Sequence, residues 1–159
     1  MSSTYRGGLK RRDRLRRRQN VPEERHTFDY AVVRVVPHVE REEFLNVGVI
    51  LSCQAADFLS ARFHVNAKRL SALAPELDLK EVQSHLEAMR LICEGGEQAG
   101  PIGRLPRRAR FDWLVAPRST VIQTSPVHTG LCSDPQKALD ELLRKMVSTQ
   151  SDIQNPELS

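Results

Sequence analysis

The chain has 159 residues and a formal net charge of +4, with 40% apolar and 5% aromatic residues. This length fits one domain with tails and allows a single hydrophobic core built mainly from Leu, Val, Ala and Ile. No run approaches the roughly eighteen apolar residues of a membrane helix, and no apolar stretch follows the basic N-terminus as in a secretory signal. Three widely spaced cysteines, Cys53, Cys93 and Cys132, favour a reduced, cytoplasmic chain without disulfides.

The positive charge is concentrated in an N-terminal arm, residues 1–26. Residues 1–20 hold eight Lys or Arg and one Asp, a balance of +7, while the remaining residues have a small negative balance. We expect this arm to be disordered, because its arginines repel one another in any compact form. It is either a solubilising tail or an arm that binds nucleic acid through counterion release. The arginines of that second interpretation are Arg11, Arg12, Arg14, Arg16, Arg17 and Arg18.

Two strands open the folded domain, which we place at residues 27–147. Valine-rich Asp29–Pro37 and Leu45–Cys53 are separated by a short charged connection, which predicts an antiparallel pair. Gly48 inside the second strand predicts a bulge or a close approach by another backbone. Arg34 interrupts the apolar first strand, either on its solvent face or paired with a carboxylate.

The connection carries carboxylates that are candidates for a site. Glu42 and Glu43 precede Asn46, and with Glu40 they place three carboxylates within four residues. This cluster suits acid–base or metal chemistry as well as an ordinary solvent-exposed hairpin loop.

A third strand and two helices follow. Phe58–Val65 alternates, with Leu59 on its apolar face. Asn66 is the predicted N-cap of a short helix, and Asp78 that of a longer one ending before Gly95. The longer helix has an amphipathic stripe, formed by Leu79, Val82, Leu86, Met89 and Cys93.

A glycine-rich linker, Gly95–Gly103, leads to a second group of arginines that includes Arg107 and Arg108. These two belong to the nucleic-acid interpretation together with the arm. Phe111–Val115 fits a strand or a helix, and we predict a helix.

Two short strands and a helix complete the domain. Thr120–Thr124 and Val127–Cys132 are predicted strands around a Ser-Pro turn, and Asp134 is the predicted cap of the last helix. The buried face of that helix is predicted to contain Leu139, Leu142, Leu143 and Met146. Residues 148–159 form a frayed polar tail.

The stretch Phe111–Cys132 most resembles a site, because it holds the only Trp and many polar side chains. An Arg fork with hydroxyl and amide donors suits a phosphate or carboxylate. A nucleophilic Ser125–His128 pair lacks the surrounding elbow motif, and no closely spaced Cys or His pair predicts a metal. We therefore expect an anion pocket and no cofactor. The candidate ligand-binding residues are Arg118, Ser119, Thr120, Gln123, His128, Thr129, Arg34, Glu42, Glu43 and Asn46.

Two long runs carry a family resemblance: YAVVRVVPHVEREEFLNVGVIL, and RFDWLVAPRSTVIQTSPVHTGLC before the Asp134-Pro135 helix start. They resemble the bacterial domain-of-unknown-function family 3037 over about Phe28 to Val147. The resemblance implies a small cytosolic bacterial protein without an established activity. It also implies a protein partner, a HipA-like kinase, because such genes often lie beside those of the family.

We therefore predict an α+β fold, an antiparallel sheet of four to five strands with helices packed mainly on one face. The expected function is a non-catalytic binding or adaptor module with an anion-binding pocket. Nucleic-acid binding through the arm, or an enzyme acting on a small phosphorylated or amide substrate, are the alternatives.

Overall fold

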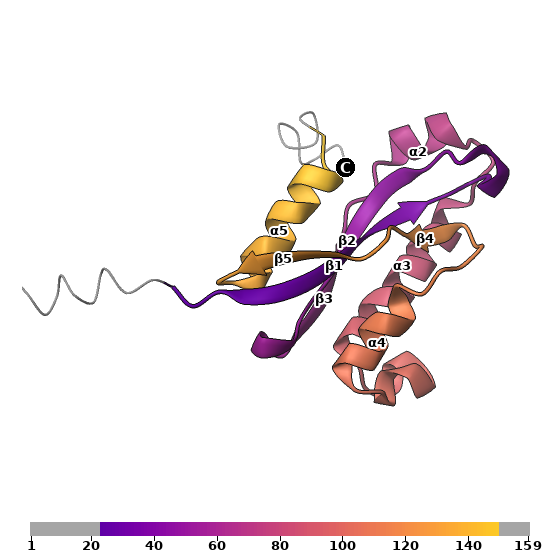
Figure 1. Cartoon of the computed structure of the whole chain (residues 1–159). Helices are drawn as coiled ribbons and strands as arrows, with labels where there is room; N and C mark the ends of the chain where they lie inside the picture. The colour runs from indigo at the N-terminus through magenta and orange to yellow at the C-terminus, as the bar shows by residue number, and fades with distance from the viewer. Residues whose placement is uncertain (1–22, 150–159) are drawn as a thin grey trace, which may run out of the picture.

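The computed structural model describes residues 23–149, and their fold is α+β (Figure 1). In this part of the chain all strand pairings are antiparallel. The strands are β1 (His26–Val35), β2 (Leu45–Cys53), β3 (Phe58–Phe63), β4 (Ile122–Thr124) and β5 (His128–Cys132). The helices are α2 (Ala67–Leu73), α3 (Leu79–Glu94), α4 (Arg107–Leu114) and α5 (Pro135–Met146). Short 3₁₀ segments are η1 (Val39–Arg41), η2 (Gln54–Ala56) and η3 (Glu97–Arg104).

The five strands of the described residues form one sheet in which β1 is central. Its order is β3-β2-β1, and β4 and β5 both lie along the other side of β1. β5 pairs with the first half of β1 and β4 with its last residues. The predicted α+β fold with an antiparallel sheet is confirmed.

Apolar side chains cover both faces of the sheet. On one face, Val33 and Ile50 pack with Leu86 of α3 and Phe111 of α4 in the larger core. On the other face, Val49 and Leu51 of β2 pack against Leu139 of α5. Figure 1 shows α5 on the opposite side of the sheet from α3 and α4.

Gly48 produces the bulge that its position predicts. The pairing of β1 with β2 shifts there, so that Gly48 lies opposite Val33 but Asn46 lies opposite Arg34. A Cβ atom at Gly48 would lie 2.8 Å from the Arg62 carbonyl oxygen and would overlap the Phe63 ring. The bulge lets Val47 and Ile50 both enter the larger core, although they are three positions apart and would face opposite sides of a regular strand.

Ser125 bridges the gap between β4 and β5. Its Oγ accepts a hydrogen bond of 2.9 Å from the Val32 amide, and its own amide donates to the Val32 carbonyl at 2.8 Å. The hydroxyl also donates to the Pro126 carbonyl. Ser125 is buried and continues the ladder of β1 where regular pairing stops.

Several helix predictions are confirmed. The carboxylate or amide oxygens of Asn66, Asp78 and Asp134 accept backbone hydrogen bonds as N-caps. Phe111–Val115 falls in α4 and its C-cap, as predicted.

Other predictions need correction. Gly95–Gly103 is not an open linker, because most of it forms the two 3₁₀ turns of η3, and Gly103 packs closely against Gly96. The predicted burial of Met146 is wrong: Met146 is exposed at the last position of α5, and Val147, the C-cap residue that follows it, is buried instead. β1 begins and ends earlier than predicted, at His26 and Val35.

Candidate functional site

The most site-like feature of the central stretch is a guanidinium held over an indole. Arg118 Cζ lies 3.9 Å from the Trp113 ring centroid, and Arg118 Nη2 donates to the Trp113 carbonyl at 2.5 Å. Trp113 lies near the end of α4, so the turn that follows the helix brings Arg118 back over it. This stacking fixes the plane of the guanidinium and leaves further N–H donors for a ligand.

Arg118 lines a pocket of about 180 Å³ between α3, the end of α4 and β4. Met89, Leu114 and Ile122 give it an apolar floor, and His85, Thr120 and Gln123 contribute polar atoms. The complete lining is His85, Met89, Leu114, Ala116, Arg118, Thr120, Ile122, Gln123 and Thr124, which contains no carboxylate.

The charge of Arg118 is not matched by a carboxylate among residues 23–149. In the part of the chain that the structure describes, no carboxylate lies within 4 Å of its guanidinium, whereas Arg62, Arg90 and Arg108 each contact one. A half-buried arginine without a carboxylate is poised to bind an external anion.

The polar neighbours of Arg118 are partly used by the turn itself. The Thr120 hydroxyl donates to the Ile122 carbonyl at 2.7 Å, and Gln123 Nε2 donates to the Thr120 carbonyl at 2.9 Å. The Thr124 hydroxyl donates to the Val115 carbonyl at 3.3 Å. These bonds hold the turn that presents Arg118. Ser119, also predicted as a ligand, is exposed and does not line the pocket.

Arg34 and Asn46 come together, but on the other face of the sheet. They are cross-strand neighbours, and Asn46 Nδ2 donates to the Met146 carbonyl at the end of α5 at 3.0 Å. The Arg34 guanidinium lies 4.1 Å from the centroid of the Phe44 ring. Cross-strand neighbours share a face, so these residues lie on the α5 side, away from the α3 side that holds the Arg118 pocket.

His128 and Thr129 are separated from Arg118 along β1. His128 pairs with Tyr30 in the sheet, whereas Gln123 pairs with Arg34, four residues or about 13 Å further along β1. His128 packs on the Tyr30 ring, with 5.4 Å between centroids. The structure therefore does not bring His128 to the Arg118 pocket.

Thr129 belongs to a cluster around Asp29 instead. Asp29 accepts hydrogen bonds from Arg108 Nη1 at 2.6 Å and from the Thr129 hydroxyl at 2.8 Å. The hydrogen bond from Arg108 holds the pKa of the Asp29 carboxyl below its ordinary value. This cluster ties α4 to the β1–β5 pair.

Glu42 and Glu43 stay in the hairpin connection. Both are exposed, and Glu42 ends η1 in a left-handed conformation with φ 55°. Neither lines the Arg118 pocket. In this structure both residues belong to a solvent-exposed turn.

The arginines of the nucleic-acid alternative divide into two groups. Arg11, Arg12, Arg14, Arg16, Arg17 and Arg18 lie outside the described residues. Arg107 contacts Asp57 at 3.3 Å, and Arg108 contacts Asp29 and Asp112. The positive charges of Arg107 and Arg108 are therefore largely balanced by these carboxylates.

Several pocket residues were not predicted as site residues, and two of them come from a distant helix. His85 and Met89 belong to α3, 33 and 29 positions before Arg118 in the sequence. Their spacing of four predicts one helix face, but nothing local indicates that this face meets the turn after α4. Leu114 was seen only as a helix residue.

Residues 23–149 contain no group of three or more His, Cys, Asp or Glu placed to hold a metal ion. Among the helices of the same range, none combines the length and apolar character needed to cross a bilayer.

Comparison with known proteins gives a family and no characterised relative. A family model described as protein of unknown function, DUF3037, matches residues 30–147. No curated protein and no solved structure matches the chain. The matched range contains the sheet from Tyr30 onward, the Arg118 pocket and all of α5. The chain therefore belongs to the DUF3037 family.

Proposed function

We propose that the protein is a non-catalytic binding module that takes an anionic group of its partner in the Arg118 pocket. The observation behind this proposal is the stacked, half-buried guanidinium of Arg118, which has no carboxylate partner among the described residues. It faces a small pocket with an apolar floor. A phosphate or carboxylate attached to a short apolar group suits this combination of charge and lining.

The hydroxyl groups of the pocket favour binding over covalent chemistry. Thr120 and Thr124 both direct their hydroxyl protons to backbone carbonyls and not to a base. Ser125 is buried against β1, and His128 lies on β5 opposite Tyr30, away from the pocket. Among the described residues that line the pocket, no hydroxyl is thus hydrogen-bonded to a base beside Arg118.

The family resemblance supplies the partner of this proposal, a HipA-like kinase. The anionic group would then be a phosphate or a carboxylate on the kinase surface. Isothermal titration of the full-length chain with the HipA-like kinase of the same genome tests this pairing. Binding that weakens at least tenfold in Arg118→Gln supports it, and equal binding by both proteins contradicts a role for the pocket.

A probe experiment tests the pocket without assuming the partner. Phenyl phosphate, benzoate and neutral benzamide are titrated into the ¹⁵N-labelled full-length protein, and amide shifts are followed. We expect phenyl phosphate or benzoate to shift amide resonances of α3, β4 and the turn at Arg118, and benzamide to have little effect. The relative affinity of the two anions distinguishes a phosphate site from a carboxylate site.

Arg69→Gln is the matched control for Arg118→Gln. Arg69 lies exposed on α2 and does not line the pocket, so its substitution removes the same charge elsewhere. Anion binding that is lost equally in both variants, or benzamide binding as tight as that of the anions, contradicts the proposed site.

A further inference from the structure

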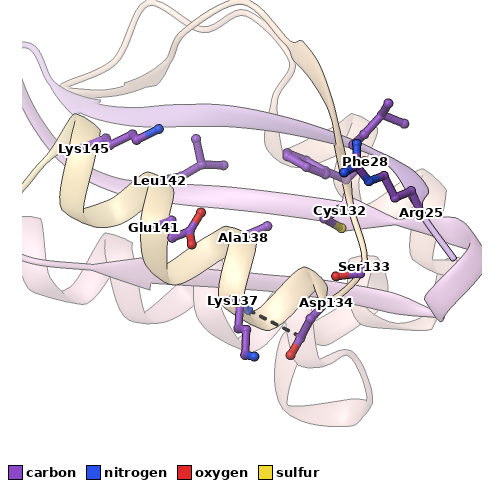
Figure 2. Close-up of a pocket in the computed structure, with 11 residues that line it drawn as sticks. Arg25, Phe28, Cys132, Ser133, Asp134, Lys137, Ala138, Glu141, Leu142 and Lys145 are labelled. Carbon is purple, nitrogen blue, oxygen red and sulfur yellow. Dashed lines mark hydrogen bonds between the residues drawn. The ribbon is translucent and has the colours of Figure 1, made fainter. Parts of the chain in front are cut away.

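A second surface lies on the other side of the sheet, in a groove of about 490 Å³ between β5 and α5 (Figure 2). Phe28 lies at its base, and Ala138 and Leu142 contribute apolar atoms from α5. Arg25, Lys137 and Lys145 also line it. None of these residues belongs to the Arg118 pocket, so this surface is independent of the proposed function.

The groove exists because α5 does not cover the whole face. α5 packs over β2 and β3, which leaves the β1–β5 part of the face open on that side. Gly130 of β5 lies opposite Phe28, and a Cβ atom there would lie 2.6 Å from Phe28 Cζ. The missing side chain lets the Phe28 ring lie flat against β5 and keeps the base of the groove smooth.

β5 is also a free edge of the sheet. Within residues 23–149 it pairs with β1 and with no other strand. The outward N–H and C=O groups of such a strand are a template for another extended chain. Leu131, the next-to-last residue of β5, is 64% exposed, which is unusual for a large apolar side chain in a strand.

The charges around the groove favour an acidic occupant. Within the described residues, no carboxylate lies within 4 Å of the charged side-chain groups of Arg25, Lys137 or Lys145. Of the two acidic residues that line the groove, Asp134 is engaged as the N-cap of α5, which leaves Glu141.

We infer that the β5–α5 groove binds an acidic peptide segment of a partner protein as an added strand. The peptide backbone pairs with the outer edge of β5, alternate apolar side chains enter the groove toward Phe28 and Leu142, and acidic side chains meet Lys137 and Lys145. A single-stranded nucleic acid fits this surface less well. Phe28 is buried and offers no exposed ring for base stacking.

The test uses the full-length chain and a library of ten-residue fluorescent peptides that alternate Val, Ile or Leu with Asp or Glu. Matched libraries replace the acids by Lys, or place Pro at every second position. Fluorescence anisotropy should show the acidic peptides binding at least tenfold more tightly than the peptides of either matched library. Lysine side chains are repelled by Lys137 and Lys145, and proline has no backbone N–H to pair with β5. Hydrogen exchange of β5 amides should slow in the complex.

The double variant Lys137→Glu with Lys145→Glu reverses two exposed charges of the groove and should weaken peptide binding at least fivefold. The double variant Lys68→Glu with Lys80→Glu makes the same charge change at exposed helix positions outside the groove and should change the peptide dissociation constant less than twofold. Arg118→Gln should leave peptide binding unchanged, which separates failure of this inference from failure of the Arg118 proposal.

Several results would overturn the inference. One is equal loss of peptide binding in the two double variants, and another is tighter binding of an oligothymidine than of every acidic peptide. Peptide binding without slower hydrogen exchange in β5 is a third. A failure of all peptides to bind overturns it as well. Sedimentation of the free protein as a dimer whose β5 amides are protected would assign the edge to a second copy instead.

Discussion

The guanidinium of Arg118 stacks on the indole ring of Trp113, with 3.9 Å between Arg118 Cζ and the ring centroid. The two residues are only five positions apart, so the turn after α4 is sufficient to create the contact. An arginine fixed in this way loses little freedom when it binds an anion, because its plane is already set.

Replacing Trp113 by Leu should weaken anion binding while the fold persists. The ring is 37% exposed, and a cation–π contact at an exposed site contributes about 0.5–1 kcal/mol, or roughly two- to fivefold in affinity. Trp113→Phe retains a ring and should fall between the wild type and the Leu variant. The measurement is the dissociation constant of phenyl phosphate. An unchanged constant in Trp113→Leu would show that stacking does not prepare Arg118.

Ser125→Ala should destabilise the protein by about 1–3 kcal/mol, because it leaves the buried Val32 amide without its hydrogen-bond acceptor. Urea denaturation measures the change in the free energy of unfolding. Ser119→Ala is the control, since Ser119 is exposed, and should change stability by at most about 0.5 kcal/mol. If both variants were equally stable, the hydroxyl of Ser125 would not be needed to join β4 and β5.

Arg110 has a structural role that its place in a basic run does not suggest. It is buried and donates to the carbonyls of Ile92, Cys93 and Leu105, at 2.8, 2.8 and 3.1 Å. These bonds satisfy the last carbonyls of α3 and fasten α4 to it. Nearby Arg104 is exposed and provides a matched control.

Arg110→Met keeps the apolar stem and should cost about 2–4 kcal/mol, because three carbonyls lose a charged donor. Arg104→Met should cost at most about 0.5 kcal/mol. Thermal or urea unfolding of both variants makes the comparison. Similar losses in the two would contradict the assignment of Arg110 to the end of α3.

Asp29 should make the stability of the fold sensitive to acid. Arg108 lowers the pKa of Asp29 in the folded state, below the ordinary value of about 3.9. The stabilisation from this group is therefore complete above about pH 5 and disappears as the pH falls through the folded pKa. The stability difference between the wild type and Asp29→Asn should be constant near neutrality and shrink below about pH 4.

Urea denaturation between pH 2.5 and 7 tests this prediction. Asp57→Asn is the control, because the Asp57 side chain is 88% exposed in its contact with Arg107 and its loss should have a smaller effect. A difference for Asp29→Asn that grows as the pH falls would have the wrong sign and would contradict the account.

The sequence predicts those features that depend on neighbouring residues. The caps at Asn66, Asp78 and Asp134 need only local hydrogen bonds, and the bulge at Gly48 follows from a glycine inside a strand. The antiparallel β1–β2 pair follows from a short connection. These parts of the α+β fold can therefore be predicted from the sequence alone.

The arrangement of the candidate site depends on contacts between distant segments. Gln123 and His128 are five positions apart, yet the Ser125 junction places them beside different parts of β1. Arg34 and Arg118 lie on opposite faces, which a list of polar residues does not reveal. His85 joins the pocket through the packing of α3, and no local pattern indicates that contact.

The central claim is that Arg118 binds an anion in the pocket beside α3 and β4. The most direct measurement is the dissociation constant of phenyl phosphate and of benzoate, from amide shifts, in the wild type, Arg118→Gln, Arg118→Lys and Arg69→Gln. The account predicts tenfold or greater loss in Arg118→Gln, an intermediate loss in Arg118→Lys because ammonium lacks the planar fork, and no loss in Arg69→Gln. Undiminished anion binding by Arg118→Gln, or no binding by the wild type, would contradict it.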